Sequence, residues 1–249
     1  MKLGMILALA ATAVVAVTGC KGVRTAAPER LPYPNVQLPR NFKNADPAPQ
    51  LDKSSVVISI LDSPHVWIGP QEYSDASGMD QIRDAVQQAQ PKVVYVRANG
   101  NLDYLTVLRA INSARKSGAL EFALKVQMPT GLDRQFSIRV LPEPTEEFFE
   151  KKNPALIGVI LSADSKISLV KGGLDHGPVG LDGTTEDLGI LSDTSRLAQA
   201  LAQTLGDRTD RKVTIKATRK TPYNDVVTII DAVKGAGASP IVLQIDDLP

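Results

Sequence analysis

Hydrophobic positions recur with two different periods along this chain, and their order predicts alternating strands and helices. Apolar residues lie at helical spacing from Tyr104 to Ala114 and again from Tyr223 to Val233. Short runs rich in β-branched residues flank both stretches, and Gly118 and Gly237 stand where the two helices are expected to stop. Each stretch therefore predicts a strand, a helix and a second strand, which is the order of a parallel α/β unit.

The two stretches are similar in sequence as well as in pattern. Residues 94–126 placed over residues 213–245, an offset of 119 without gaps, match at eight of 33 positions. The matched pairs include Tyr104 with Tyr223 and Gly118 with Gly237. About two matches are expected from average composition. The excess predicts an internal duplication.

The segments upstream of these stretches correspond more loosely. Apolar strands are expected at residues 56–61 and 156–161, each followed by a turn and a second short strand. Amphipathic helices are expected at residues 79–89 and 195–205. The pattern predicts an α/β fold built from two copies of a two-layer unit, each a mixed sheet with helices on one face.

The amino terminus has the pattern of a secretory signal. A short positive start precedes an apolar run at residues 3–17, and Val17-Thr18-Gly19-Cys20 follows at once. The run is short for a membrane-spanning helix, which needs about 20 residues. The four residues resemble a bacterial lipobox, so we expect Cys20, the single cysteine, to be acylated and to anchor the mature chain. An uncleaved membrane helix with an incidental cysteine is the alternative.

The residues after the cysteine indicate how the anchored chain is organised. Lys21 stands where enterobacterial lipoproteins kept in the inner membrane carry aspartate, which favours an outer-membrane anchor facing the periplasm. Residues 21–35 hold three prolines and no apolar period, so they predict an extended tether. The expected parts are a signal peptide at 1–19, the lipidated cysteine and tether at 20–35, a first domain at 36–127, a linker at 128–137 and a second domain at 138–249.

A short motif closes both copies. The first copy has Arg97-Ala98-Asn99 followed by Tyr104 and Gly118, and the second has Lys216-Ala217-Thr218 followed by Tyr223 and Gly237. With the strand and helix order, this resembles the periplasmic domain of the ExbD/TolR family, in which a strand ending in Arg-Ala-Asp precedes the tyrosine, the glycine and a last strand. The resemblance implies a non-catalytic accessory protein of a proton-driven envelope motor. Implied partners are a MotA-like, ExbB-type subunit and TonB or TolA, and TolR also binds peptidoglycan.

Two departures limit what the resemblance implies. The transmembrane helix of the family carries an aspartate that responds to protons, whereas residues 1–20 contain no acidic residue. We therefore do not expect this chain to perform the proton-linked step in that way. The aspartate of the motif is also replaced, by Asn99 and Thr218. Because family members work as dimers, the two copies are expected to form an intramolecular pseudo-dimer.

Composition narrows the classes of partner and chemistry. The chain has 28 Lys and Arg against 27 Asp and Glu, and 4% aromatic residues, which argues against nucleic acid. One cysteine and two histidines provide no standard metal-ligand set, and no cluster of titratable groups marks an active site. We expect no metal, no cofactor and no enzymatic activity. A Gly-rich insert at residues 171–193, which contains His176, is expected to be a surface loop.

One local group of positive residues is the candidate binding site. Its members are Arg208, Arg211, Lys212, Lys216, Arg219 and Lys220. One interpretation is a solvated loop beside an edge strand protected by lysines; the other is attraction for acidic groups of peptidoglycan or of a partner protein. The leading hypothesis is a lipid-anchored binding or scaffold component that contacts envelope proteins, with strand addition at a sheet edge as its mode. A peptidoglycan-binding module for envelope integrity is the alternative.

Overall fold

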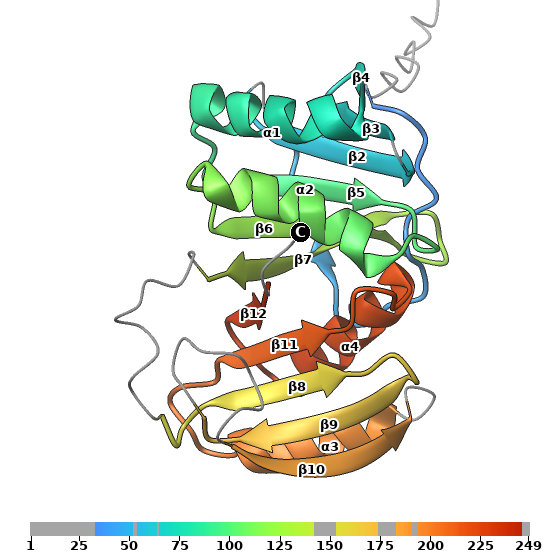
Figure 1. The fold of residues 1–249 in the computed structure, drawn as a ribbon. Coiled ribbons are helices and arrows are strands. Elements are labelled where there is room, and N and C mark those ends of the chain that lie inside the picture. The colour runs from blue at the N-terminus through green and yellow to red at the C-terminus, as the bar shows by residue number, and fades with distance from the viewer. Residues whose placement is uncertain are drawn as a thin grey trace, which may run out of the picture. The chain divides into compact units, whose positions relative to one another are not determined.

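The structure is a computed structural model, and the part of the chain that it describes begins at Tyr33 (Figure 1). The described residues are 33–51, 54–63, 65–141, 153–173, 183–190 and 194–245. The predicted signal peptide, Cys20 and most of the tether lie outside these residues, as does His176. In the described part of the chain, no helix has the length and apolar character needed to cross a membrane.

The described residues form one mixed sheet with four helices, which confirms the α/β class. The helices are α1 (Asp75–Ala89), α2 (Tyr104–Lys116), α3 (Thr194–Leu205) and α4 (Tyr223–Gly235). The strands of the first half are β1 (Asp46–Pro47), β2 (Val56–Asp62), β3 (His65–Ile68), β4 (Gln71–Ser74), β5 (Val94–Ala98) and β6 (Glu121–Gln127). They are followed by β7 (Asp133–Val140), β8 (Ile157–Leu161), β9 (Lys166–Lys171), β10 (Thr184–Ile190), β11 (Val213–Ala217) and β12 (Ile241–Leu243).

The strand order is arranged around β7. It runs β10-β9-β8-β11-β12-β7-β6-β5-β2-β3-β4, so five strands of each half flank β7 in the same succession. In the first half β2, β5 and β6 are parallel and β3 and β4 add antiparallel hairpins. The second half repeats this with β8, β11 and β12 parallel and β9 and β10 antiparallel. β7 is antiparallel to β6 and parallel to β12, so it belongs to both halves.

β7 corrects the predicted linker at residues 128–137, because the second half of that segment is a strand. From Gln135 to Val140, buried and exposed side chains alternate along β7, beginning with two successive buried residues. Phe136 and Ile138 are buried, whereas Ser137 and Arg139 are exposed. Alternation of this kind is the signature of a strand with one buried face, and here it extends across the expected boundary between the two domains.

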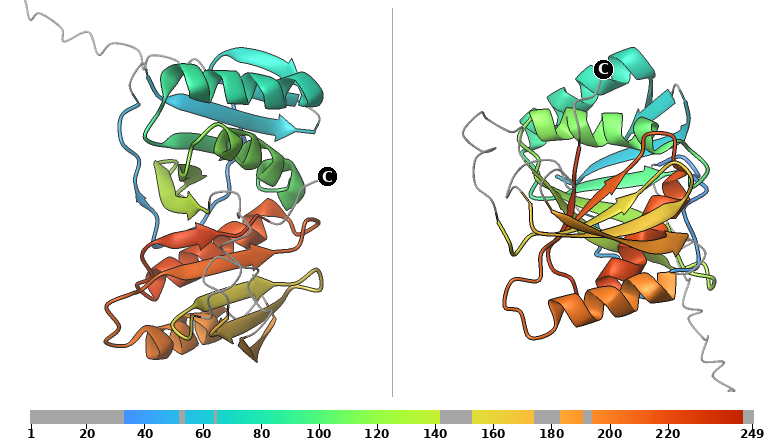
Figure 2. Two further views of the ribbon diagram at one scale, coloured as in Figure 1. Left: turned by 60° about the vertical axis from the view of Figure 1, so that its left-hand side comes forward. Right: turned by 60° about the horizontal axis from the view of Figure 1, so that its bottom comes forward.

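The core of each half lies between its strands and its two helices. In the first half, Ile58, Val96 and Ile111 have no exposed surface, and in the second half Ile215 and Ile230 have none. Each such side chain stabilises the fold by about 1.5–3 kcal/mol relative to an exposed one. In Figure 1, α1 and α2 lie in front of the strands, and α3 and α4 lie behind them; Figure 2 shows the same from other sides. The predicted arrangement, with helices on one face of the sheet, therefore holds within each half but not for the sheet as a whole.

The Gly-rich insert also differs from its prediction. Residues 184–190 form β10, which pairs antiparallel with β9 from Thr184 opposite Lys171 onward. Leu188 is buried and attaches this strand to the core, whereas the neighbouring Glu186 and Asp187 are exposed. The insert is thus partly an edge strand of the sheet. Its polar composition is the usual protection of such an edge.

Several elements of the two halves keep the offset found in the sequence. β5 and β11 begin at Val94 and Val213, and α2 and α4 begin at Tyr104 and Tyr223, which is 119 residues apart in both cases (213 minus 94 and 223 minus 104). α2 and α4 each have 13 residues. Each helix is followed by a glycine with positive φ, 97° at Gly118 and 86° at Gly237. A left-handed glycine at this position ends a helix without the strain that a side chain adds.

Candidate functional site

The two halves meet at the amino-terminal ends of α2 and α4. The N-cap residues, Asp103 and Pro222, make no side-chain cap bond, although the first N–H groups of a helix have no partner inside it. For α2, the second half supplies the missing acceptors: Tyr104 N donates to Thr221 O at 2.8 Å and Leu105 N to Arg219 O at 2.9 Å. Backbone carbonyls of the loop before α4 therefore cap α2.

The first half caps α4 in the same way. Tyr223 N donates to Leu102 O at 2.8 Å, and Asn224 N donates to Gly100 O at 2.9 Å. Adding 119 to the donor numbers of the two bonds that cap α2, and subtracting 119 from their acceptor numbers, gives the two bonds that cap α4. The four hydrogen bonds are therefore reciprocal, and each half completes a helix of the other.

Two tyrosines are buried beside these bonds. Tyr104 is 1% exposed and Tyr223 is 0% exposed. Among the described residues, the Tyr223 hydroxyl has no hydrogen-bond partner. Burial, and to a lesser degree the neighbouring Tyr104, raises the pKa of Tyr223 above its usual value. Both rings act as core side chains at the junction and are not exposed for a partner.

A segment that begins within the last residues of the predicted tether, residues 33–47, runs along both halves. In the first half, Gly100 N donates to Gln37 O at 3.1 Å and Gln127 N donates to Pro39 O at 2.9 Å. In the second half, the backbone N of Asn44 donates to Asp231 Oδ1 at 2.7 Å, and Lys234 forms an ion pair with Asp46. This segment is thus bonded to both halves.

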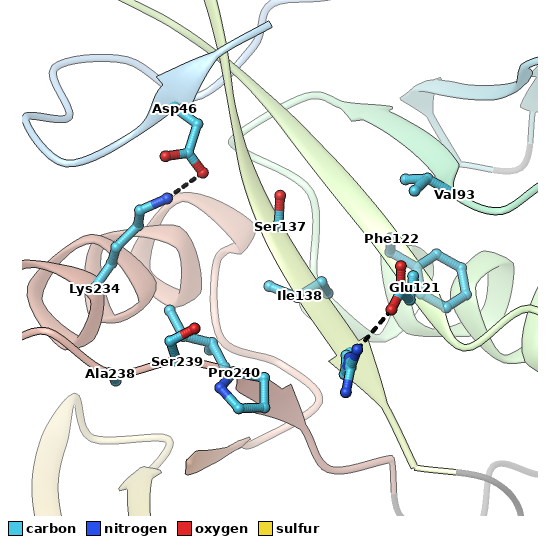
Figure 3. Close-up of a pocket in the computed structure, with 12 residues that line it drawn as sticks. Asp46, Val93, Glu121, Phe122, Ser137, Ile138, Lys234, Ala238, Ser239 and Pro240 are labelled. Atoms are coloured by element: carbon cyan, nitrogen blue, oxygen red, sulfur yellow. Dashed lines mark hydrogen bonds and ion pairs between the residues drawn. The ribbon is translucent and has the colours of Figure 1, made fainter. Parts of the chain in front are cut away.

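A pocket of about 510 Å³ lies where β6, β7, β12 and the end of α4 come together (Figure 3). One ion pair joins Lys234 to Asp46, and the Arg139 guanidinium donates to Glu121 Oε1 at 2.8 Å. Figure 3 shows Lys234 and Glu121 on opposite sides of β7. The remaining lining residues are Val93, Phe122, Ser137, Ile138, Ala238, Ser239, Pro240 and Ile241. The site is polar at two sides and apolar between them.

The predicted basic group does not come together as a whole. The Arg208 guanidinium donates to Ala155 O at 2.6 Å, and Arg211 donates to Gly237 O at 2.9 Å and to Ala236 O at 3.4 Å. Arg211 therefore satisfies carbonyls at the end of α4, where a positive group is favoured. Lys212 is half-buried, and its backbone N donates to the Asp210 carboxylate. The functions of Arg208 and Arg211 in the fold are structural.

The other three members gather around a second pocket, of about 380 Å³, at the carboxyl ends of β8 and β11. Lys216, Arg219 and Lys220 line it together with the apolar side chains of Ile160 and Leu161. No acidic residue is among the described residues that line it. Where the connections that follow two adjacent parallel strands run in opposite directions, a crevice forms at the carboxyl ends of these strands. Ligands of open α/β sheets usually bind in this crevice. The bond from Leu105 N to Arg219 O holds the basic loop in place.

Two further cations, Lys125 and Arg97, lie outside the predicted basic group. The Lys125 ammonium donates to Gln135 Oε1 at 3.0 Å and lies 4.9 Å from the centre of the Tyr95 ring. The Arg97 guanidinium donates to Pro34 O at 2.9 Å. Burial lowers the pKa of both groups. A lone Lys or Arg within an alternating strand is too common to mark such a site. No group of three potential metal ligands occurs among the described residues.

Comparison with protein families identifies the class. The family model for biopolymer transport protein ExbD/TolR matches residues 123–248, which is 126 of the 249 residues, and the chain belongs to this family. The match begins in β6 and covers β7 and the whole second half, including the basic pocket. The family consists of non-catalytic components of envelope transport or energy transduction that work with ExbB/TolQ-type and TonB/TolA-type partners. A search of curated proteins found no match.

Proposed function

We propose that this chain is a lipid-anchored, non-catalytic binding component of an ExbD/TolR-type envelope system, in which two family units form one intramolecular pair. The observation that carries the proposal is the reciprocal set of four backbone bonds between the halves. Each half supplies the carbonyls that a helix of the other half needs, as two subunits of a symmetric dimer would. Joining two units in one chain makes their pairing independent of protein concentration.

The pairing is tested by a disulfide across the junction. Asp103 and Pro222 are bridge partners in an antiparallel pair, where Cα atoms are about 4.5–5.5 Å apart, within the range of a disulfide. A chain with Cys20→Ala, Asp103→Cys and Pro222→Cys is expected to oxidise to a monomer that migrates faster in non-reducing electrophoresis. Each single-cysteine variant is the control. A disulfide-linked dimer as the main product, or an obligate homodimer in sedimentation, would reject the intramolecular pair.

The lipid anchor is proposed from the sequence of residues 17–20. A fatty chain contributes about 0.8 kcal/mol for each buried CH₂, and more than one chain gives stable anchoring. Mass spectrometry of the mature protein is expected to find an acylated Cys20 as the first residue. Cys20→Ala should move the protein from the membrane fraction to the soluble fraction or leave it unprocessed. An unmodified Cys20 preceded by residues 1–19 in the wild type would contradict the anchor.

Partner binding is proposed to occur by strand addition at β10. This strand ends the strand order, so the sheet has no further described strand beyond it, and at seven residues it is longer than β4 at the opposite end. A photo-reactive side chain at the exposed Thr185 is expected to crosslink to an ExbB/TolQ-type or TonB/TolA-type protein of the same cells. The same group at Gln88, on the exposed face of α1, is the control. Equal yields from both positions would argue against β10.

Binding to peptidoglycan is the second candidate, and the gathering of Lys216, Arg219 and Lys220 at one pocket favours it. Cosedimentation with purified peptidoglycan is expected to fall several-fold when all three become Gln, and to weaken with added salt because the attraction is between charges. The matched control replaces three exposed cations elsewhere, Lys43, Lys92 and Arg196, by Gln. If both triple variants bind as well as the wild type, the basic pocket does not bind peptidoglycan.

A further inference from the structure

The middle of the sheet contains a gap along one edge of β7. On the side away from β6, β7 pairs first with β1, at Gln135 opposite Asp46, and then with β12, at Arg139 opposite Val242. No described strand residue pairs with residues 136–138 on that edge. The pocket of Figure 3 lies at this gap and includes Ser137 and Ile138 in its lining.

The backbone of Ser137 points into the gap. Val140 N donates to Leu120 O at 3.0 Å, so the peptide groups of Val140 face β6. Residues of an antiparallel pair alternate between facing the partner strand and facing away. Ile138 therefore also faces β6, whereas the N–H and C=O of Ser137 and Arg139 face the other edge. Arg139 is opposite β12 there, and exposed Ser137 presents one donor and one acceptor to the pocket.

The charges around the gap are balanced. Lys234 is paired with Asp46, and Arg139 is paired with Glu121, so the four groups sum to zero. A net anion or a net cation gains little long-range attraction to such a site. A molecule with one positive and one negative end can instead contact a carboxylate and a cation at once. Phe122 and Ile138 are also among the lining residues, but both are buried and offer a ligand little surface.

We propose that this pocket binds a small zwitterionic molecule of the dipeptide type. Its peptide group pairs with the N–H and C=O of Ser137 as one residue of an added strand would. Its carboxylate is bound by Arg139 or Lys234, and its ammonium by Glu121 or Asp46. The gap is too short for a longer strand, because β1 and β12 occupy β7 on both sides. The volume, about 510 Å³, is in the usual range for small-ligand sites. This pocket shares no lining residue with the basic pocket, and ligand binding there does not depend on the proposed function.

Titration calorimetry with alanyl-alanine tests the site on the whole chain with Cys20→Ala. We expect measurable binding that Arg139→Gln weakens about tenfold, since a hydrogen bond to a charged group is lost. Lys166→Gln, which breaks the similarly exposed pair with Asp164, is the control and should bind like the wild type. Ser137→Pro removes the N–H that faces the gap, whereas Ser137→Ala keeps it. Only the proline variant should lose binding.

The blocked peptide N-acetyl-alanyl-alanine amide tests the same point on an unaltered site. It keeps the peptide group and lacks both charges, so we expect it to bind at least tenfold more weakly than alanyl-alanine. This comparison decides the question even if Ser137→Pro does not fold, which a thermal melt would reveal. Absence of heat with millimolar alanyl-alanine, equal binding of the blocked peptide, or full binding by the Arg139→Gln variant would each overturn the proposal.

Discussion

Removing the hydroxyl of Tyr223 is expected to stabilise the protein. This hydroxyl is completely buried and has no hydrogen-bond partner among the described residues. A buried polar group without a partner costs about 1–3 kcal/mol. Tyr223→Phe leaves the ring in place, so we expect the free energy of unfolding at pH 7 to rise by about 1 kcal/mol. For a folded part of this size, the melting temperature should rise by about 2–4 °C.

The same substitution should change the dependence of stability on high pH. Burial raises the pKa of Tyr223 in the folded state, whereas in the unfolded chain a tyrosine has its ordinary pKa of about 10. Below that pH the Tyr223 hydroxyl is neutral in both states, so it does not change the free energy of unfolding with pH. As pH rises above it, the unfolded state releases a proton that the folded state keeps, so stability falls by up to about 1.4 kcal/mol per pH unit. Tyr223→Phe removes this contribution.

Urea denaturation of both proteins at pH 7 and at steps from pH 9 to pH 11 measures the two effects. The difference in unfolding free energy between variant and wild type should be positive at pH 7 and should grow above pH 10. Tyr73→Phe, on the short edge strand β4, is the control and should leave both quantities unchanged. If Tyr223→Phe is destabilised at pH 7, the hydroxyl makes a bond, and the reasoning from burial fails.

The remaining predictions concern the bonds that join the halves and end the helices. Asp231→Ala removes the acceptor of the Lys43 and Asn44 N–H groups and should lower the free energy of unfolding by about 1–2 kcal/mol; no change in urea denaturation would mean that water replaces it. Gly237→Ala should lower the free energy of unfolding more than Gly118→Ala does. Both residues have positive φ, but only at position 237 does the new Cβ meet the Arg211 guanidinium, at 2.6 Å. Equal losses in urea denaturation would show that the guanidinium moves freely. Arg211→Gln should lower the free energy of unfolding by about 1 kcal/mol and leave peptidoglycan binding unchanged. Weaker peptidoglycan binding with unchanged stability would show that Arg211 belongs to the binding site.

The elements that the sequence predicted best are those whose stability is local. Residues 104–116 and 223–235 became α2 and α4 because their apolar residues share one helical face and a left-handed glycine follows each. The strands at 94–98 and 213–217 followed from short β-branched runs, which are buried on one face in β5 and at three successive residues in β11. In these cases the pattern within about fifteen residues determines the structure.

The elements that were missed depend on neighbours far away in the chain. β4 is four polar residues that become a strand only because β3 provides hydrogen bonds, and β1 is two residues beside β7. β10 was hidden in a Gly-rich segment for the same reason. The predicted basic group also depends on distant neighbours. Lys216, Arg219 and Lys220 share a pocket. Arg208 and Arg211 instead donate to backbone carbonyls that no local sequence pattern reveals.

The reciprocal caps and β7 together explain why the two halves need each other. Without the second half, the N–H groups of Tyr104 and Leu105 would lose their carbonyl acceptors, and the Asp103 side chain makes no cap bond to α2. Without the first half, α4 would lose Leu102 O and Gly100 O, and β12 would lose β7 unless the boundary included that strand. The family match agrees with assigning β7 to the second unit, since the match begins at residue 123, before β7. A unit cut at residue 138, as the sequence pattern suggested, would therefore divide a strand that both sheets share, whereas a unit that begins near residue 123 keeps it whole.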